Sequence, residues 1–85
     1  MVASESRMPT ILIVSSYRFF FFSGDREEPV HVHVERDKHV AKFWLVPVRL
    51  ESSGGFKRKE LNRIQQLIEE DQARFVEAWN EYFGE

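Results

Sequence analysis

The strongest constraint on the fold is a strict alternation of apolar and polar residues from Val30 to Glu35. Valines at every second position alternate with His31, His33 and Glu35. Successive side chains of a β-strand point to opposite faces, so one face carries apolar β-branched residues and the other carries two imidazoles and a carboxylate. A second strand-like run, Val40 to Val46, follows after a short polar stretch. The two runs together predict a β-hairpin.

Further strands are predicted on both sides of this hairpin. Residues 10–14 are apolar and rich in β-branched side chains, and residues 17–22 form a strand with aromatic residues on both faces. The polar segment 23–29 contains Gly and Pro, which predicts a loop. Pro47 cannot donate to a sheet ladder and therefore fits an edge or a bend, beyond which residues 48–50 can continue the sheet.

From residue 56 onward the apolar period changes from that of a strand to that of a helix. An apolar stripe runs through Leu61 and Ile68 and stays in phase with a later stripe through Phe75. One continuous helix over this length would span roughly 39 Å, whereas a seven-residue strand covers roughly 23 Å. We therefore expect a break or kink at residues 70–72, and Gly84 is a suitable C-terminal stop.

These segments predict an α+β fold, in which an antiparallel β-meander of four to five strands precedes a long or kinked C-terminal helical segment packed on one face. The 85 residues form a single domain over residues 8–85, with the meander at 8–50 and the helical segment at 56–84. Residues 1–7 are polar and non-periodic, and we predict that they are a disordered N-terminal extension.

Composition limits the chemistry and the setting of the chain. The absence of cysteine excludes disulfides and thiolate metal sites. The net charge of -2 gives no bulk attraction to nucleic acid. No apolar run approaches the length of a membrane span, and the N-terminus lacks the apolar core of a signal peptide. We expect a cytoplasmic protein without a membrane partner.

The histidine pair carries three alternative interpretations. His31 and His33 leave the same strand face with Cα atoms about 6.6 Å apart, so both imidazoles can bind one metal ion, with Glu35 or His39 as the third ligand. They can instead form an acid–base pair that cleaves RNA, one ring accepting the 2′-hydroxyl proton and the other protonating the leaving oxygen. The third interpretation is a solvated sheet face without chemistry.

The residues leave open whether the chain is an enzyme. In the RNA-cleavage alternative, nearby cations would stabilise the charge on the phosphorane: Arg18, Lys38 and Lys42. No residue pattern requires a cofactor, and we expect none. Zinc remains the alternative, at His31, His33 and Glu35.

Two other surfaces could bind a partner. A cluster of cations lies at the predicted helix start and could hold phosphates: Lys57, Arg58, Lys59 and Arg63. An ordinary solvated helix face would have the same composition. Near the C-terminus, Trp79 and Tyr82 belong either to the core or to an interface. We expect a small cognate protein or a second copy of the chain as the partner, with RNA as the alternative.

Five segments occur in the order and spacing of a small bacterial family: YRFFFFS, EPVHVHVE, AKFWLVPVRL, GFKRKEL and EAWNEYFGE. Over residues 8–85 the chain resembles the family catalogued as domain of unknown function 4160. Such sequences more often have Ser at position 57. Ser would cap the helix N-terminus there, whereas Lys57 cannot.

The resemblance adds an expectation about function, although the family has no established activity. Its members are similar in size and genetic setting to parts of bacterial toxin–antitoxin pairs. The resemblance therefore implies a protein-binding module in a pair of that kind. A ribonuclease-type toxin that uses His31 and His33, and a metal-binding domain at the same residues, are the alternatives.

Overall fold

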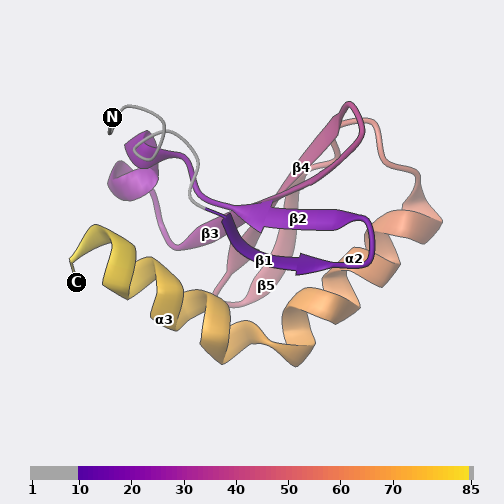
Figure 1. Ribbon diagram of the computed structural model, residues 1–85. Coiled ribbons are helices and arrows are strands. Elements are labelled where there is room, and N and C mark those ends of the chain that lie inside the picture. The colour runs from indigo at the N-terminus through magenta and orange to yellow at the C-terminus, as the bar shows by residue number, and fades with distance from the viewer. Residues whose placement is uncertain (1–9, 85) are drawn as a thin grey trace.

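The computed structural model describes residues 10–84, which form one five-stranded antiparallel sheet and two C-terminal helices (Figure 1). The strands follow chain order across the sheet: β1 (Thr10–Val14), β2 (Tyr17–Phe20), β3 (His31–Arg36), β4 (His39–Leu45) and β5 (Val48–Ser52). A short 3-10 helix, η1 (Ser23–Glu27), separates β2 from β3, and α2 (Arg58–Glu70) and α3 (Gln72–Phe83) follow β5. The predicted α+β meander is confirmed. The predictions for residues 1–7 lie outside the described part of the chain.

The predicted hairpin is formed by β3 and β4. Its register pairs His31 with Trp44 and Arg36 with His39. Asp37 occupies the turn with a φ of 57°, a left-handed conformation that Asp tolerates better than most residues. The strand predicted at residues 17–22 ends earlier, at Phe20, because the chain turns into η1 shortly afterwards.

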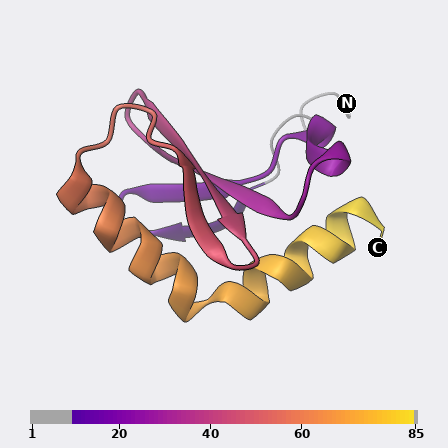
Figure 2. The same ribbon diagram turned by 180° about the vertical axis from the view of Figure 1, so that it is seen from behind.

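Both helices cover the valine face of the sheet (Figure 2). Val32 and Val34 are fully buried there, together with aromatic and aliphatic residues from the neighbouring strands and both helices: Phe19, Phe43, Leu45, Ile64, Ile68 and Phe75. The apolar row read from the alternation is therefore the half of the core that the sheet supplies.

The helical segment bends where the sequence predicts it. Asp71 separates α2 from α3 with a φ of -120° and a ψ of 28°, and the two helices follow the sheet at an angle to each other (Figure 2). Gln72 fixes the bend to the sheet by donating to the Leu45 carbonyl at 2.5 Å. Gly84 ends α3 in the left-handed conformation, with a φ of 77°. Neither described helix is long and apolar enough to cross a membrane.

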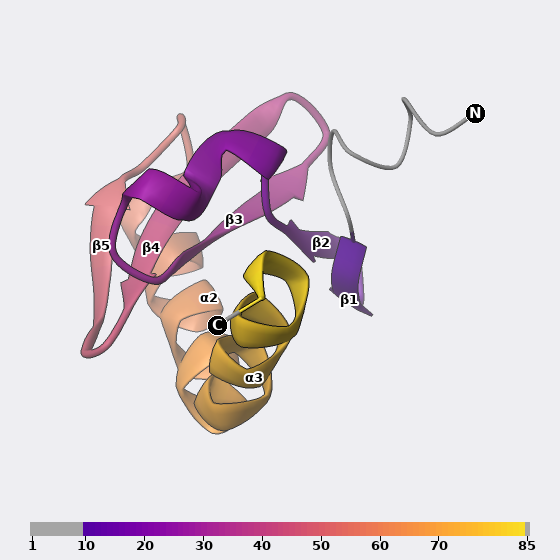
Figure 3. The ribbon, with the colours of Figure 1, turned by 90° about the vertical axis from the view of Figure 1, so that its left-hand side faces the viewer.

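The other face of the sheet is closed at one end by η1. Arg26 of this segment donates to the Phe83 carbonyl at 2.7 Å, which fastens η1 to the last turn of α3. Figure 3 shows η1 and the C-terminal end of α3 at the same end of the molecule. The segment predicted as a loop is therefore a short cover over part of the histidine face.

Candidate functional site

The site begins with two elements that are adjacent in the chain, η1 and β3. The alternation of β3 places His31 and His33 on the face opposite Val32 and Val34. In η1, the Asp25 carboxylate accepts a hydrogen bond from the Phe22 backbone N–H at 2.8 Å. This local bond holds the Asp25 side chain at the start of η1, where it reaches the histidines.

Asp25, His31 and His33 form a compact cluster. Asp25 Oδ2 lies 3.1 Å from His31 Nε2 and 3.2 Å from His33 Nε2, and one donor atom from each residue lies within 4.8 Å of the others. The side chain of His31 is 0% exposed, and those of His33 and Asp25 are 12% and 13% exposed. The cluster is thus enclosed, and its polar atoms have little access to bulk water.

A backbone carbonyl determines the tautomer of His31. Its Nδ1 lies 2.8 Å from the Pro29 carbonyl oxygen, which can only accept, so Nδ1 carries the proton. In the neutral ring, Nε2 then carries a lone pair, and this lone pair faces the Asp25 carboxylate. Two acceptors in contact repel each other, so this arrangement calls for a proton on Nε2 or for a cation between the groups.

The Nε2 atoms of the two histidines are not satisfied by the described protein groups. The Nε2 atom of His31 and the Nε2 atom of His33 are both buried, and neither has a hydrogen-bond partner among the described residues. Asp25 Oδ2 lies 3.1 Å from the first and 3.2 Å from the second, so the two nitrogens converge on one carboxylate oxygen. Buried polar atoms without a partner are rare and point to a missing ligand such as an ion.

Aromatic side chains enclose the two imidazoles. Phe20 stacks on His33 with ring centroids 5.4 Å apart, and Phe22 packs edge-on against it at 4.6 Å. Trp79 of α3 packs against His31 at 5.1 Å. Burial lowers the pKa of the His33 imidazole, and the attraction of the Asp25 carboxylate opposes that effect only in part. His33 is therefore held in the neutral form, which is the form that binds metal ions.

The two separations between the histidine nitrogens and the carboxylate oxygen suit ligands of one metal ion. Two ligand atoms about 2.0 to 2.1 Å from a tetrahedral zinc ion lie about 3.3 Å apart. The observed separations of 3.1 and 3.2 Å between the histidine nitrogens and Asp25 Oδ2 are close to that value. The bond from His31 Nδ1 to the Pro29 carbonyl is the kind of outer contact that orients a metal-binding histidine.

A second charged pair borders the cluster without joining it. Glu28 Oε1 lies 3.8 Å from His31 Nδ1, on the ring edge away from Asp25. Lys42 Nζ pairs with Glu28 and lowers the pKa of its carboxyl. The same ammonium lies 4.8 Å above the Trp44 ring. Lys42 is thus held by a carboxylate and an aromatic ring beside the site.

The structure brings Asp25 to the histidines and holds Glu35 elsewhere. Arg18 donates to Glu35 Oε1 through Nε at 3.0 Å, in a pair between β2 and β3. His39 lies at the far end of the hairpin, with Nδ1 3.2 Å from the Gly54 carbonyl oxygen.

Sequence reasoning missed Asp25 because the path of residues 23–29 cannot be read from a pattern. The one available signal was a carboxylate directly after Gly24 in the turn that leads into β3.

The other predicted binding residues lie away from this cluster. Lys57, Arg58, Lys59 and Arg63 are exposed around the start of α2, and Lys38 is exposed in the β3–β4 turn. Tyr82 is 37% exposed, whereas Trp79 is 4% exposed and packs in the core against Phe21. Trp79 therefore contributes to the site by packing against the His31 ring.

Comparison with known protein families identifies a match that covers most of the described chain. The family model described as Domain of unknown function (DUF4160) matches residues 16–80. The match begins just before β2 and ends within α3, so it includes Asp25 and both histidines of the cluster. No curated protein and no solved structure matches the chain.

Proposed function

The chain belongs to the DUF4160 family, and from the geometry of its own residues we propose that it is a metal-binding domain that holds one divalent ion between Asp25, His31 and His33. The observation that carries the proposal is the pair of buried Nε2 atoms that lack hydrogen-bond partners beside a single carboxylate oxygen. A cation there would engage both nitrogen lone pairs and balance the charge of Asp25.

The ligand set favours zinc or a related transition metal. Imidazole nitrogens suit Zn²⁺, Fe²⁺, Ni²⁺ and Cu²⁺ better than they suit Mg²⁺ or Ca²⁺. Three protein ligands leave at least one coordination position for water or another small ligand. Because the ligands come from η1 and β3, the ion would also join the short cover to the sheet.

The geometry favours metal binding over the ribonuclease alternative. An acid–base pair must reach its substrate, but the His31 side chain is fully buried and its Nδ1 is engaged by Pro29. A metal ligand needs no such exposure. The protein-binding role in a toxin–antitoxin-like pair stays a prediction, as does an RNA partner.

Isothermal titration of the chelator-treated protein with Zn²⁺ tests the proposal. We expect one ion per chain. Asp25→Asn removes the negative charge of one ligand, and His33→Gln removes the imidazole nitrogen of another. Each change should lower the affinity for zinc by at least about 100-fold, which is the upper end of the loss caused by removing an outer contact. His39→Gln and Glu35→Gln are the matched controls, and both should bind zinc like the parent.

A buried ion pair is the competing explanation, and nitrogen NMR of the histidine rings separates the two. If His31 carries protons on both ring nitrogens in the metal-free protein and zinc produces no binding heat, the cluster is an Asp25–His31 salt bridge. Zinc binding that survives both Asp25→Asn and His33→Gln would equally contradict the proposed site.

A further inference from the structure

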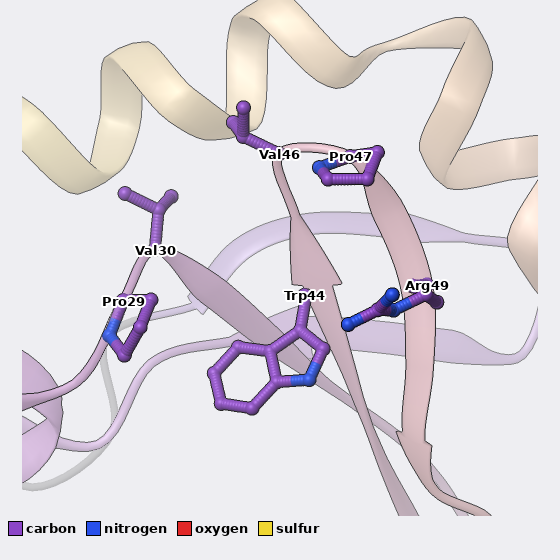
Figure 4. Close-up of a pocket in the computed structure, with 6 residues that line it drawn as sticks. All are labelled: Pro29, Val30, Trp44, Val46, Pro47 and Arg49. Atoms are coloured by element: carbon purple, nitrogen blue, oxygen red, sulfur yellow. The ribbon is translucent and has the colours of Figure 1, made fainter.

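A groove of about 580 Å³ lies beside the cluster, where β3, β4 and β5 approach the end of the sheet (Figure 4). Its volume is in the range of sites that hold small ligands or single side chains. We call it the Trp44 groove, and its lining is largely apolar: Pro29, Val30, Trp44, Val46, Pro47 and Arg49.

The polar side-chain atoms of the Trp44 groove are all donors. The Trp44 indole nitrogen and the Arg49 guanidinium carry N–H groups and cannot accept hydrogen bonds. In Figure 4 the indole nitrogen lies on the side of the ring that faces Arg49. No described residue pairs with the exposed Arg49 side chain, and no acidic residue is among the lining residues. The charge and hydrogen-bonding capacity of the groove therefore complement a carboxylate on an apolar body.

The sheet register places the two donor residues side by side. Trp44 and Arg49 are directly paired across the β4–β5 ladder. The Trp44 ring is further held by Lys42, 4.8 Å above it, and by an edge contact with His31 at 5.7 Å between centroids. Because the Trp44 ring is ordered before binding, it loses less entropy when a ligand arrives.

We propose that the Trp44 groove binds the C-terminal residue of a peptide that ends in an apolar side chain. The terminal carboxylate pairs with Arg49 and accepts from the Trp44 indole N–H. The apolar side chain packs between Val30 and Val46, the latter 66% exposed in the free protein. This site shares no residue with the Asp25–His31–His33 cluster and stands independently of it.

The position of β5 favours a peptide over a free acid. β5 is an edge of the sheet, so its outer backbone N–H and C=O groups take no partner within the sheet. An extended peptide can pair with such an edge and at the same time place its terminal carboxylate on Arg49. A small organic acid would use only the groove.

The test is an NMR titration of the full chain with acetylated tetrapeptides that end in Leu, Val or Phe. We expect at least one of them to shift the Trp44 indole N–H signal. Trp79, which is buried in the core, provides an internal reference whose signal should stay in place. The same peptide with a C-terminal amide should bind at least about tenfold more weakly, because it loses the charge-assisted bonds.

Two variants locate the carboxylate. Arg49→Gln should weaken the free-carboxylate peptide to the level of the amide, whereas Arg63→Gln, which removes an exposed cation on α2 that does not border the groove, should have no effect. The proposal would be overturned if no peptide shifts the Trp44 signal, if the acid and amide peptides bind equally, or if Arg49→Gln binds the acid peptide with unchanged affinity. Hexanoate, a small organic acid with an apolar chain, is the control for the peptide backbone. Binding of hexanoate as tight as that of the peptides would also overturn the proposal. Arg49→Gln should still bind zinc, so failure here is distinguishable from failure of the metal site.

Discussion

At the scale of single residues, burial and one hydrogen bond separate the chemistry of otherwise similar histidines. His31 is enclosed, and the Pro29 carbonyl holds the proton on Nδ1, so Nε2 is left for a ligand. His39 is only partly buried, and its Nδ1 contacts the Gly54 carbonyl at the far end of the hairpin. The tertiary surroundings, and not the residue type, determine which ring can serve a site.

A second residue-scale feature is the network around Glu60. Tyr17 donates to Glu60 Oε2 at 2.7 Å, and Arg36 donates to both carboxylate oxygens at 2.7 Å. These bonds join β2 and β3 to the first turn of α2. The pKa of the Glu60 carboxyl is lowered, first by the bonds from Arg36 and then by the bond from Tyr17.

This network predicts an acid-dependent loss of stability. Because the pKa of Glu60 is lower in the folded than in the unfolded chain, its contribution is complete above the unfolded pKa and is lost as the pH falls through the folded pKa. We expect Glu60→Gln to lower the free energy of unfolding at pH 7 and the deficit to shrink toward pH 3, as measured by urea unfolding across that range. Glu51→Gln on the exposed part of β5 is the control. A constant deficit at every pH would contradict the assignment.

At the scale of elements, the connection from β5 to α2 passes close to the start of β4. Gly54 has a φ of +61°, and a Cβ at that position would lie 1.8 Å from the Val40 carbonyl oxygen. Left-handed backbone and close approach both demand glycine here. This connection therefore determines how α2 reaches the sheet.

We expect Gly54→Ala to destabilise the fold by about 2 to 4 kcal/mol, from the left-handed backbone together with the clash. Gly24→Ala in η1 is the matched control, because a Cβ there would meet nothing within 4 Å. It should change stability by less than about 0.5 kcal/mol. Thermal unfolding of both variants measures the difference, and equal melting temperatures would show that the connection can shift without cost.

At the scale of elements, the sequence predicted the histidine pair of the site but not its carboxylate. Period-two alternation places His31 and His33 on one face whatever the rest of the chain does. The third member, Asp25, depends on η1 folding back over that face and on the contact between Arg26 and the end of α3. No local pattern specifies a contact between residues so far apart in the chain. The sequence therefore pointed to Glu35, which the structure pairs with Arg18, and not to Asp25.

At the scale of the whole molecule, an ion between η1 and β3 would couple metal binding to stability. A ligand that binds only the folded state stabilises it by about 2.7 kcal/mol when its free concentration is 100 times the dissociation constant. For a domain of this size, that gain corresponds to roughly 10 to 20 °C in melting temperature. We expect this rise with zinc and its reversal by EDTA in a thermal unfolding assay. Asp25→Asn should melt at the same temperature with and without zinc, and an identical zinc shift in that variant would place the ion elsewhere.

The sequence alone determined the order of the elements, the apolar face of β3, the bend near Asp71 and the stop at Gly84. These features follow from local rules: the side-chain period of a strand or helix, and the conformational freedom of glycine. Local rules cannot predict contacts between distant segments, because they describe each segment without the segments that pack against it.

Only the tertiary structure decided which polar groups meet. It selected Asp25 over Glu35 beside the histidines, paired Glu35 with Arg18 instead, and assembled a groove around Trp44 from two separate segments, 29–30 and 44–49. The physical reason is that hydrogen bonds and ion pairs act over a few ångströms, and those distances are fixed only when the packed core has set the strand register and positioned the covering segments.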